Sequence, residues 1–169
     1  MVKKLFLFAL VMFSALLMGC GEPLPEGMPR LIPCELTLLQ EGKPLVGATV
    51  SLLPEKDQAR WNLVGITNES GTANILANGK YKGVPEGKYK IIIIKVETEA
   101  GTGPAIPQAG EPGYDEAVAN LDKRPPAKRF TLVEDKYSNP KDTPLAIDIP
   151  ARGSVRQNIE AGKAVRISK

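Results

Sequence analysis

Few residues in this chain could carry out catalysis, because none of its 169 residues is a histidine. Zinc peptidases and nucleophiles activated by histidine need an imidazole, so these classes are excluded. A serine–lysine dyad or a carboxylate pair remains, and Asp115 with Glu116 and Glu134 with Asp135 are adjacent acids. Neighbouring acids on a loop are usually solvated charge. We therefore expect no enzymatic activity, no metal site and no cofactor, with an unrecognised hydrolase as the remote alternative.

Cys20 is the residue whose surroundings predict a specific modification. Lys3 and Lys4 precede the apolar run LFLFALVMFSALLMG, which ends directly before Cys20. This order is typical of a secretory signal peptide. The stretch LMGC also resembles the lipobox of bacterial lipoproteins, whose cysteine is linked to diacylglycerol and becomes the first mature residue. We predict that residues 1–19 are a lipoprotein signal peptide and that Cys20 is the lipid anchor. The alternative is an ordinary secretory signal with an incidental cysteine.

A lipid anchor would export the protein and hold it in the bacterial cell envelope, on the outer or the cytoplasmic membrane, because several acyl chains bind a bilayer stably. The signal contains two of the 22 Lys and Arg residues and none of the 19 acids, so the mature net charge is +1. This balance gives no reason to expect a nucleic-acid partner. Cys34 is then left without a disulfide partner, and we predict a small buried side chain there rather than a reactive thiol.

The residues after the anchor predict a tether followed by one β-rich domain. Residues 20–33 contain four prolines and are expected to be an extended tether. From residue 34 to 169, short β-rich runs alternate with turn signals, which predicts a single all-β domain. Within it, PLAIDI and SVRQNI flank PARG and predict a hairpin, and AGKAVRIS predicts a last strand. Residues from about 98 to 129 are rich in Gly, Pro, Ala and charge, and indicate an insertion.

Three motifs resemble carboxypeptidase-regulatory-like domains, and they occur in the same order. They are EGKPLVGATVSLLPE, GITNESGTANI and VPEGKYKIIIIK. The later stretch KYSNPKDTPLAIDI is similar to the tail of small bacterial surface lipoproteins that carry this domain. The resemblance implies an Ig-like or transthyretin-like (prealbumin-like) antiparallel β-sandwich related to an accessory domain, not to a catalytic unit. Asn68 replaces the aspartate usual in the family, but asparagine also forms an Asx turn.

The strand GKYKIIIIK breaks the alternation of apolar and polar residues expected of a half-exposed strand. Four consecutive isoleucines predict a strand that is covered on both faces. By comparison with the family strand, Tyr89, Ile91 and Ile93 should face the core, while Lys90, Ile92 and Ile94 should point outwards. Each isoleucine left in water forgoes roughly 1.5 to 3 kcal/mol, so something should cover the outer pair.

The insertion offers a cover for this outer pair. Apolar residues recur at helical spacing in PGYDEAVANLDKR, which predicts a short helix over the outer face of the isoleucine strand. The residues concerned are Tyr114, Ala117, Val118 and Leu121. If the helix lies elsewhere, Ile92 and Ile94 become the best candidates for a protein-binding surface.

A basic cluster within the insertion is the other candidate for a binding surface. It comprises Lys123, Arg124, Lys128 and Arg129, and could contact phosphate-rich envelope polymers, although a solvated linker is the simpler interpretation. The sequence therefore predicts a lipid-anchored, non-catalytic interaction or structural module that contacts the membrane through its lipid. An envelope protein or a polysaccharide is its expected partner. A glycan-binding domain is the alternative, although the mature chain has few aromatic residues for stacking.

Overall fold

The computed structural model describes residues 24–56, 60–99, 105–121 and 127–168. The largest sheet has the strand order β13 (Ala146–Ile149), β10 (Gly87–Ile94), β4 (Thr49–Pro54), β5 (Leu63–Ile66), β7 (Leu76–Ala77) and β8 (Tyr81–Lys82). The second sheet contains β14 (Val155–Glu160), β2 (Cys34–Gln40) and β3 (Lys43–Pro44), with β6 (Thr72–Asn74) also paired to β2. A third sheet consists of β11 (Val96–Glu99), β12 (Lys128–Thr131) and β15 (Ile167–Ser168). A fourth, two-stranded sheet pairs β1 (Leu31–Ile32) with β9 (Val84–Pro85). The described helices are α2 (Tyr114–Ala119) and α3 (Asp135–Ser138).

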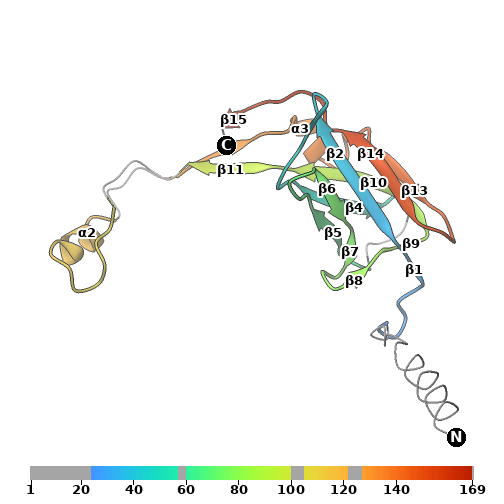
Figure 1. Cartoon of the computed structure of the whole chain (residues 1–169), viewed down its shortest axis with the longest axis horizontal. Coiled ribbons are helices and arrows are strands. Elements are labelled where there is room, and N and C mark those ends of the chain that lie inside the picture. The colour runs from blue at the N-terminus through green and yellow to red at the C-terminus, as the bar shows by residue number, and fades with distance from the viewer. Residues whose placement is uncertain (1–23, 57–59, 100–104, 122–126, 169) are drawn as a thin grey trace, which may run out of the picture.

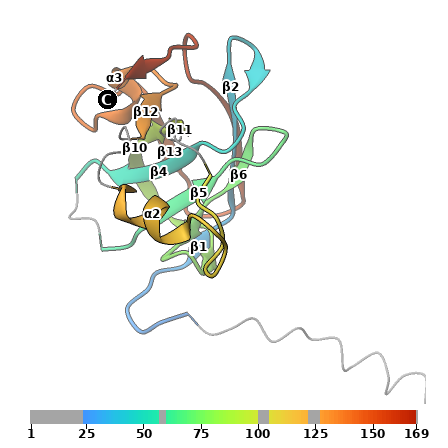
Figure 2. The same ribbon diagram turned by 90° about the vertical axis from the view of Figure 1, so that its left-hand side faces the viewer.

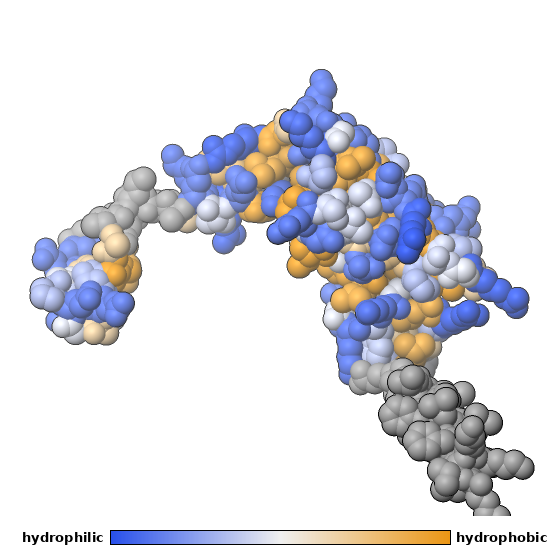
Figure 3. Space-filling view, in the orientation of Figure 1, coloured by the Kyte–Doolittle hydropathy of each residue, from blue (hydrophilic) through white to orange (hydrophobic). Residues whose placement is uncertain are grey.

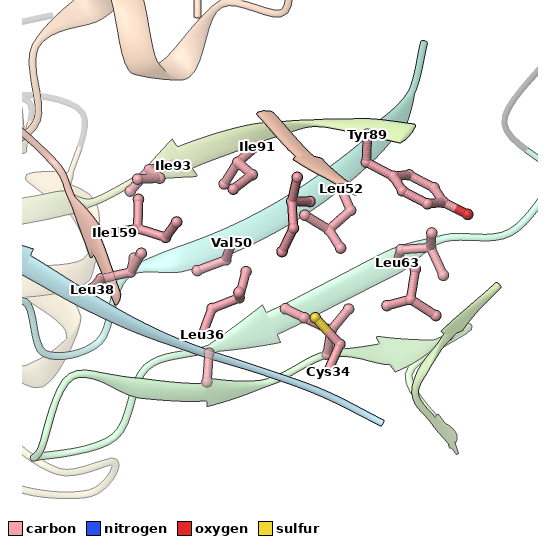
Figure 4. Packing of buried hydrophobic residues seen from close by; sticks show 14 of the residues in the cluster. Cys34, Leu36, Leu38, Val50, Leu52, Leu63, Tyr89, Ile91, Ile93 and Ile159 are labelled. Atoms are coloured by element: carbon pink, nitrogen blue, oxygen red, sulfur yellow. The ribbon is translucent and has the colours of Figure 1, made fainter. Parts of the chain in front are cut away.

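The two larger sheets face each other and form an all-β sandwich, as the sequence predicts. Figure 2 shows β2 and β6 on one side of the body, and β4, β10 and β13 on the other. Alternate side chains from both sheets meet between them (Figure 4). Among them Leu36, Leu38, Val50, Ile91 and Ile93 are fully buried. This alternation arises because successive side chains of a strand point to opposite faces.

Strand β10 places its side chains as predicted on the core face. Tyr89, Ile91 and Ile93 are buried in the core cluster, and the Tyr89 hydroxyl donates a hydrogen bond to the Pro85 carbonyl at 3.0 Å. The strand pairs antiparallel with β4 on one side and with β13 on the other. A buried tyrosine with its hydroxyl satisfied fixes the register of this strand at the edge of the core.

The predicted Asx turn forms at Asn68. Its side-chain carbonyl accepts hydrogen bonds from the backbone amides of Ser70 and Thr72, both at 3.0 Å, and from the Ser70 hydroxyl at 2.7 Å. Gly71 follows with a φ of 74°, and a Cβ there would lie 2.6 Å from the Leu38 carbonyl oxygen. The turn therefore needs glycine both for its left-handed backbone and for its close approach to β2.

The predicted hairpin between PLAIDI and SVRQNI is wrong. Strand β13 pairs with β10 in the six-stranded sheet, whereas β14 crosses to the other sheet and runs parallel to β2. Ile147, Ile149 and Ile159 are all buried. The connection is an arch between the two layers, and it lets both strands place their isoleucines in the same core.

The folded body begins before the predicted boundary at Cys34. Leu31 and Ile32 form β1, and Met28 and Ile32 are buried in the core cluster. All buried apolar side chains of the described chain lie between Met28 and Ala161. Residues 28–161 therefore contain the whole described core.

The insertion forms a β-ribbon that carries the predicted helix. Strands β11 and β12 pair antiparallel, and α2 follows beyond their outer end (Figure 1). Helix α2 has acidic residues in its first turn, and none of its residues is buried. It lies away from β10, so the prediction that it covers the isoleucine strand is wrong.

Candidate functional site

The candidate site lies on the outer face of the six-stranded sheet, which turns away from the core. The strand register aligns Ile94 with Thr49, and Thr49 with Ile66, in one row across three strands. The next row aligns Ile92, Ser51, Val64 and Leu76. We call this surface the outer face; it also includes Leu53, Lys88 and Lys90. Six of its side chains are aliphatic, which is unusual for a sheet face that points away from the core.

Three of these aliphatic side chains reach water. Ile66 is 67% exposed, Ile94 is 42% exposed and Leu53 is 36% exposed. We call these three residues the apolar strip. Ile94 therefore lies where the sequence predicts a protein-binding surface. Several exposed aliphatic side chains on one sheet face are a recognised mark of interaction surfaces.

Ile92 is 8% exposed although it points away from the core. It lines a hollow of about 440 Å³ together with Leu53, Arg60 and Trp61. The hollow opens where β4 and β5 part, because their pairing ends at Ser51 and Val64. The segment before β5 thus lies beside Ile92, and α2 does not line the hollow. The Trp61 side chain is half-buried against the core.

Polar groups surround the apolar floor of this hollow. Its lining includes Ser51, Arg60, Asn62 and Asn78. The Asn78 side-chain carbonyl accepts the Asn62 backbone amide at 3.0 Å, which holds these two residues together. The hollow is within the size range of small-molecule sites, roughly 300 to 1,000 Å³, and its mixture of apolar floor and few polar groups is typical of them. Sequence reasoning missed it because β4 and β5 part only in the folded sheet.

The outer face also carries cations. Lys88 and Lys90 point outwards from β10, and Lys95 follows the strand. The Lys90 ammonium donates to the Pro140 carbonyl at 2.9 Å, and the Lys95 ammonium to the Val46 carbonyl at 2.7 Å. None of these three lysines forms an ion pair with a carboxylate of the described residues. Lys88 aligns with the exposed Asp148 of β13, so Lys90 and Lys95 carry the positive charge that an acidic partner would meet.

The predicted basic cluster does not join the isoleucines in one site. Lys128 and Arg129 are exposed on β12, in a different sheet from Ile92 and Ile94. There they align with Glu99 and Thr98 of β11. Lys123 and Arg124 lie outside the described residues, as does Cys20.

The remaining polar candidates take structural positions. Cys34 is buried in β2, and burial raises the pKa of its thiol to about 11, so it stays protonated at neutral pH. Glu134 lies 3.3 Å from the Lys136 ammonium at the start of α3, and Asp115 and Glu116 lie in the first turn of α2. Within the described ranges, no group of three His, Cys, Asp or Glu side chains could hold a metal ion.

No helix in the described part of the chain is long and apolar enough to span a membrane. Comparisons with protein-family models, with curated proteins and with solved structures found no match to this chain.

Proposed function

We propose that this chain is a lipid-anchored, non-catalytic β-sandwich of the bacterial cell envelope, and that it binds an envelope protein through its outer face. The LMGC motif supports the anchor at Cys20. The three ordered motifs support kinship with transthyretin-like, carboxypeptidase-regulatory-like domains. The observation that carries the binding role is the apolar strip of Leu53, Ile66 and Ile94.

A protein partner fits this surface because the strip spreads over three neighbouring strands of one sheet. Burying a large aliphatic side chain completely is worth roughly 1.5 to 3 kcal/mol, so a partner that covers Ile66 and Ile94 recovers part of that energy. The surrounding lysines would select partners with acidic residues at the rim of the contact. The anchor would keep this surface close to the membrane where envelope proteins are found.

The test is capture of envelope proteins by the lipid-free mature chain, residues 21–169. Ile66→Asp places a charge in the strip, and its exposure leaves the core intact. Leu24→Asp is the matched control, since Leu24 is 43% exposed and lies outside the sheet. We expect that the wild type and the control capture the same envelope protein and that the Ile66→Asp chain does not. A captured set that Ile66→Asp leaves unchanged would contradict the proposal.

Glycan binding is the second candidate, and the hollow at Trp61 favours it. An indole beside Ile92 and Leu53 offers apolar contact to a sugar ring, while Asn62 and Ser51 offer hydrogen bonds to hydroxyls. Arg60 would pair with a carboxylate in a bidentate manner, which favours an acidic sugar.

Fluorescence titration tests this candidate, because Trp61 is the only tryptophan in the chain. Uronic-acid oligosaccharides should change the emission, and Arg60→Gln should weaken their binding. Arg152→Gln, at another exposed arginine, should not. Equal binding of neutral and acidic oligosaccharides would refute the role of Arg60, and no response to either would refute the candidate.

A further inference from the structure

The end of the β11–β12 ribbon exposes a second apolar surface. Residues 105–121, which we call the arm lobe, contain α2 and the loop before it. Three of its apolar side chains are each about two-fifths exposed: Ile106 at 43%, Val118 at 39% and Leu121 at 42%. Val118 lies near the end of α2, and Leu121 follows two residues after the helix ends. The lobe therefore presents an uncovered apolar side, as the outer face does.

The charges of the two surfaces are complementary. The arm lobe contains Glu111, Asp115 and Glu116, and all of its described charged residues are acidic; Lys123 and Arg124 follow it in the sequence, outside the described residues. The outer face and its border carry Lys88, Lys90 and Lys95, and one acid, Asp148, aligns with Lys88. Asp115 and Glu116 form no ion pair with the described residues, and neither do these lysines. Each surface thus combines exposed aliphatic area with charge that the other surface would neutralise.

The arm lobe lies away from the chain's own outer face. Figure 1 shows α2 beyond the outer end of β11, at a distance from β4, β5 and β10. In Figure 3, apolar side chains (orange) gather on the side of the lobe that turns towards the body. The lobe and the body together enclose an open, concave space, and the lobe's apolar side faces that space.

We propose that the arm lobe of one copy docks on the outer face of a second copy. The exchange would be reciprocal: each lobe covers the apolar strip of the other chain, and the pair has twofold symmetry. Val118 and Leu121 would contact Ile66 and Ile94 of the second copy, with Asp115 and Glu116 near its lysines. This proposal rests on the proposed function, because it names the partner of the same outer face.

The first measurement is the molar mass of the lipid-free mature chain by light scattering over a range of concentrations. We expect a dimer that dissociates on dilution. Val118→Asp and Ile66→Asp should each yield a monomer, and both sites are exposed, so the fold should survive. Leu24→Asp, the matched control, should remain a dimer. A wild type that is monomeric at every concentration would overturn the proposal.

The second measurement locates the contact. Cys34 is buried and protonated, so an introduced cysteine would be the reactive thiol of each variant. A Val118→Cys chain is mixed with a longer, tagged Ile66→Cys chain and treated with a short bismaleimide. We expect a cross-linked product of mixed size, and expect none when Leu24→Cys replaces Ile66→Cys.

A dimer that gives no more mixed product than the Leu24→Cys control would also overturn the exchange. The proposed function fails separately. If the wild type is monomeric but Ile66→Asp still abolishes capture of an envelope protein, the outer face binds a protein other than a second copy. If the dimer forms as expected but no envelope protein is captured, the face serves self-association alone.

Discussion

Alanine substitutions along the run of four isoleucines should give an alternating pattern of destabilisation. Ile91 and Ile93 are fully buried, so each substitution removes core atoms and leaves a cavity, at a cost of about 2 to 5 kcal/mol. Ile94 is 42% exposed, and we expect its substitution to cost less than about 1 kcal/mol. Ile92 borders the open hollow rather than closed core, so its substitution should fall between them, at about 2 kcal/mol.

Urea unfolding followed by Trp61 fluorescence measures this series, because the half-buried indole should become solvated on unfolding. The series is best made in a Val118→Asp background, so that any self-association does not add to the apparent stability. Ile66→Ala, at the most exposed isoleucine of the strip, is the control and should change the unfolding free energy little. If Ile94→Ala cost as much as Ile93→Ala, the outer position would be covered within one chain, and our account of the outer face would be wrong.

Gly71→Ala should destabilise the domain by about 1 to 3 kcal/mol in urea unfolding, because the new Cβ would meet the Leu38 carbonyl at 2.6 Å and the φ of 74° suits glycine. An unchanged midpoint would contradict the geometry of this turn. Burial raises the pKa of Cys34 from 9.0 to about 11, so the thiol of the unfolded chain ionises first. Its contribution to stability should be complete below about pH 9 and decline as the pH rises towards 11, and a Cys34→Ala chain should lack this part of the decline. Cys20→Ser should leave the protein uncleaved or soluble on membrane fractionation, and mature-sized mutant protein in the membrane pellet would refute the lipid anchor.

Local patterns in the sequence predict the parts of the fold that depend on neighbouring residues. The resemblance to the family strand, with the two-residue period of a strand, correctly places Tyr89, Ile91 and Ile93 in the core. The Asn68 turn is predictable because its hydrogen bonds join residues within four positions of each other. The helical spacing of apolar residues after Tyr114 likewise predicts α2. In each case the physical cause lies within one turn or one strand.

The sequence fails where the outcome depends on distant strands. The motif PARG between two β-rich runs fits a hairpin, but β13 pairs with β10 and β14 with β2 in the other sheet. The residues near the turn do not determine which sheet each strand joins. The same limit applies to α2, whose spacing specifies an apolar side but not the surface that it meets. The hollow at Trp61 depends on the point where β4 and β5 separate.

The outer isoleucines of β10 are not explained by strand propensity alone. The strand uses lysine at outward positions 88 and 90 and isoleucine at positions 92 and 94, without any change in its core face. Isoleucine favours strands because it is β-branched, but threonine shares this property and leaves less apolar surface in water. Thr49 aligns directly with Ile94, so a polar β-branched side chain is compatible with this row. The change to isoleucine also occurs at the end of β10 from which the β11–β12 ribbon leaves. Contact with another molecule would favour isoleucine at this end of β10. The exposed apolar area there lies beside the ribbon that carries the arm lobe.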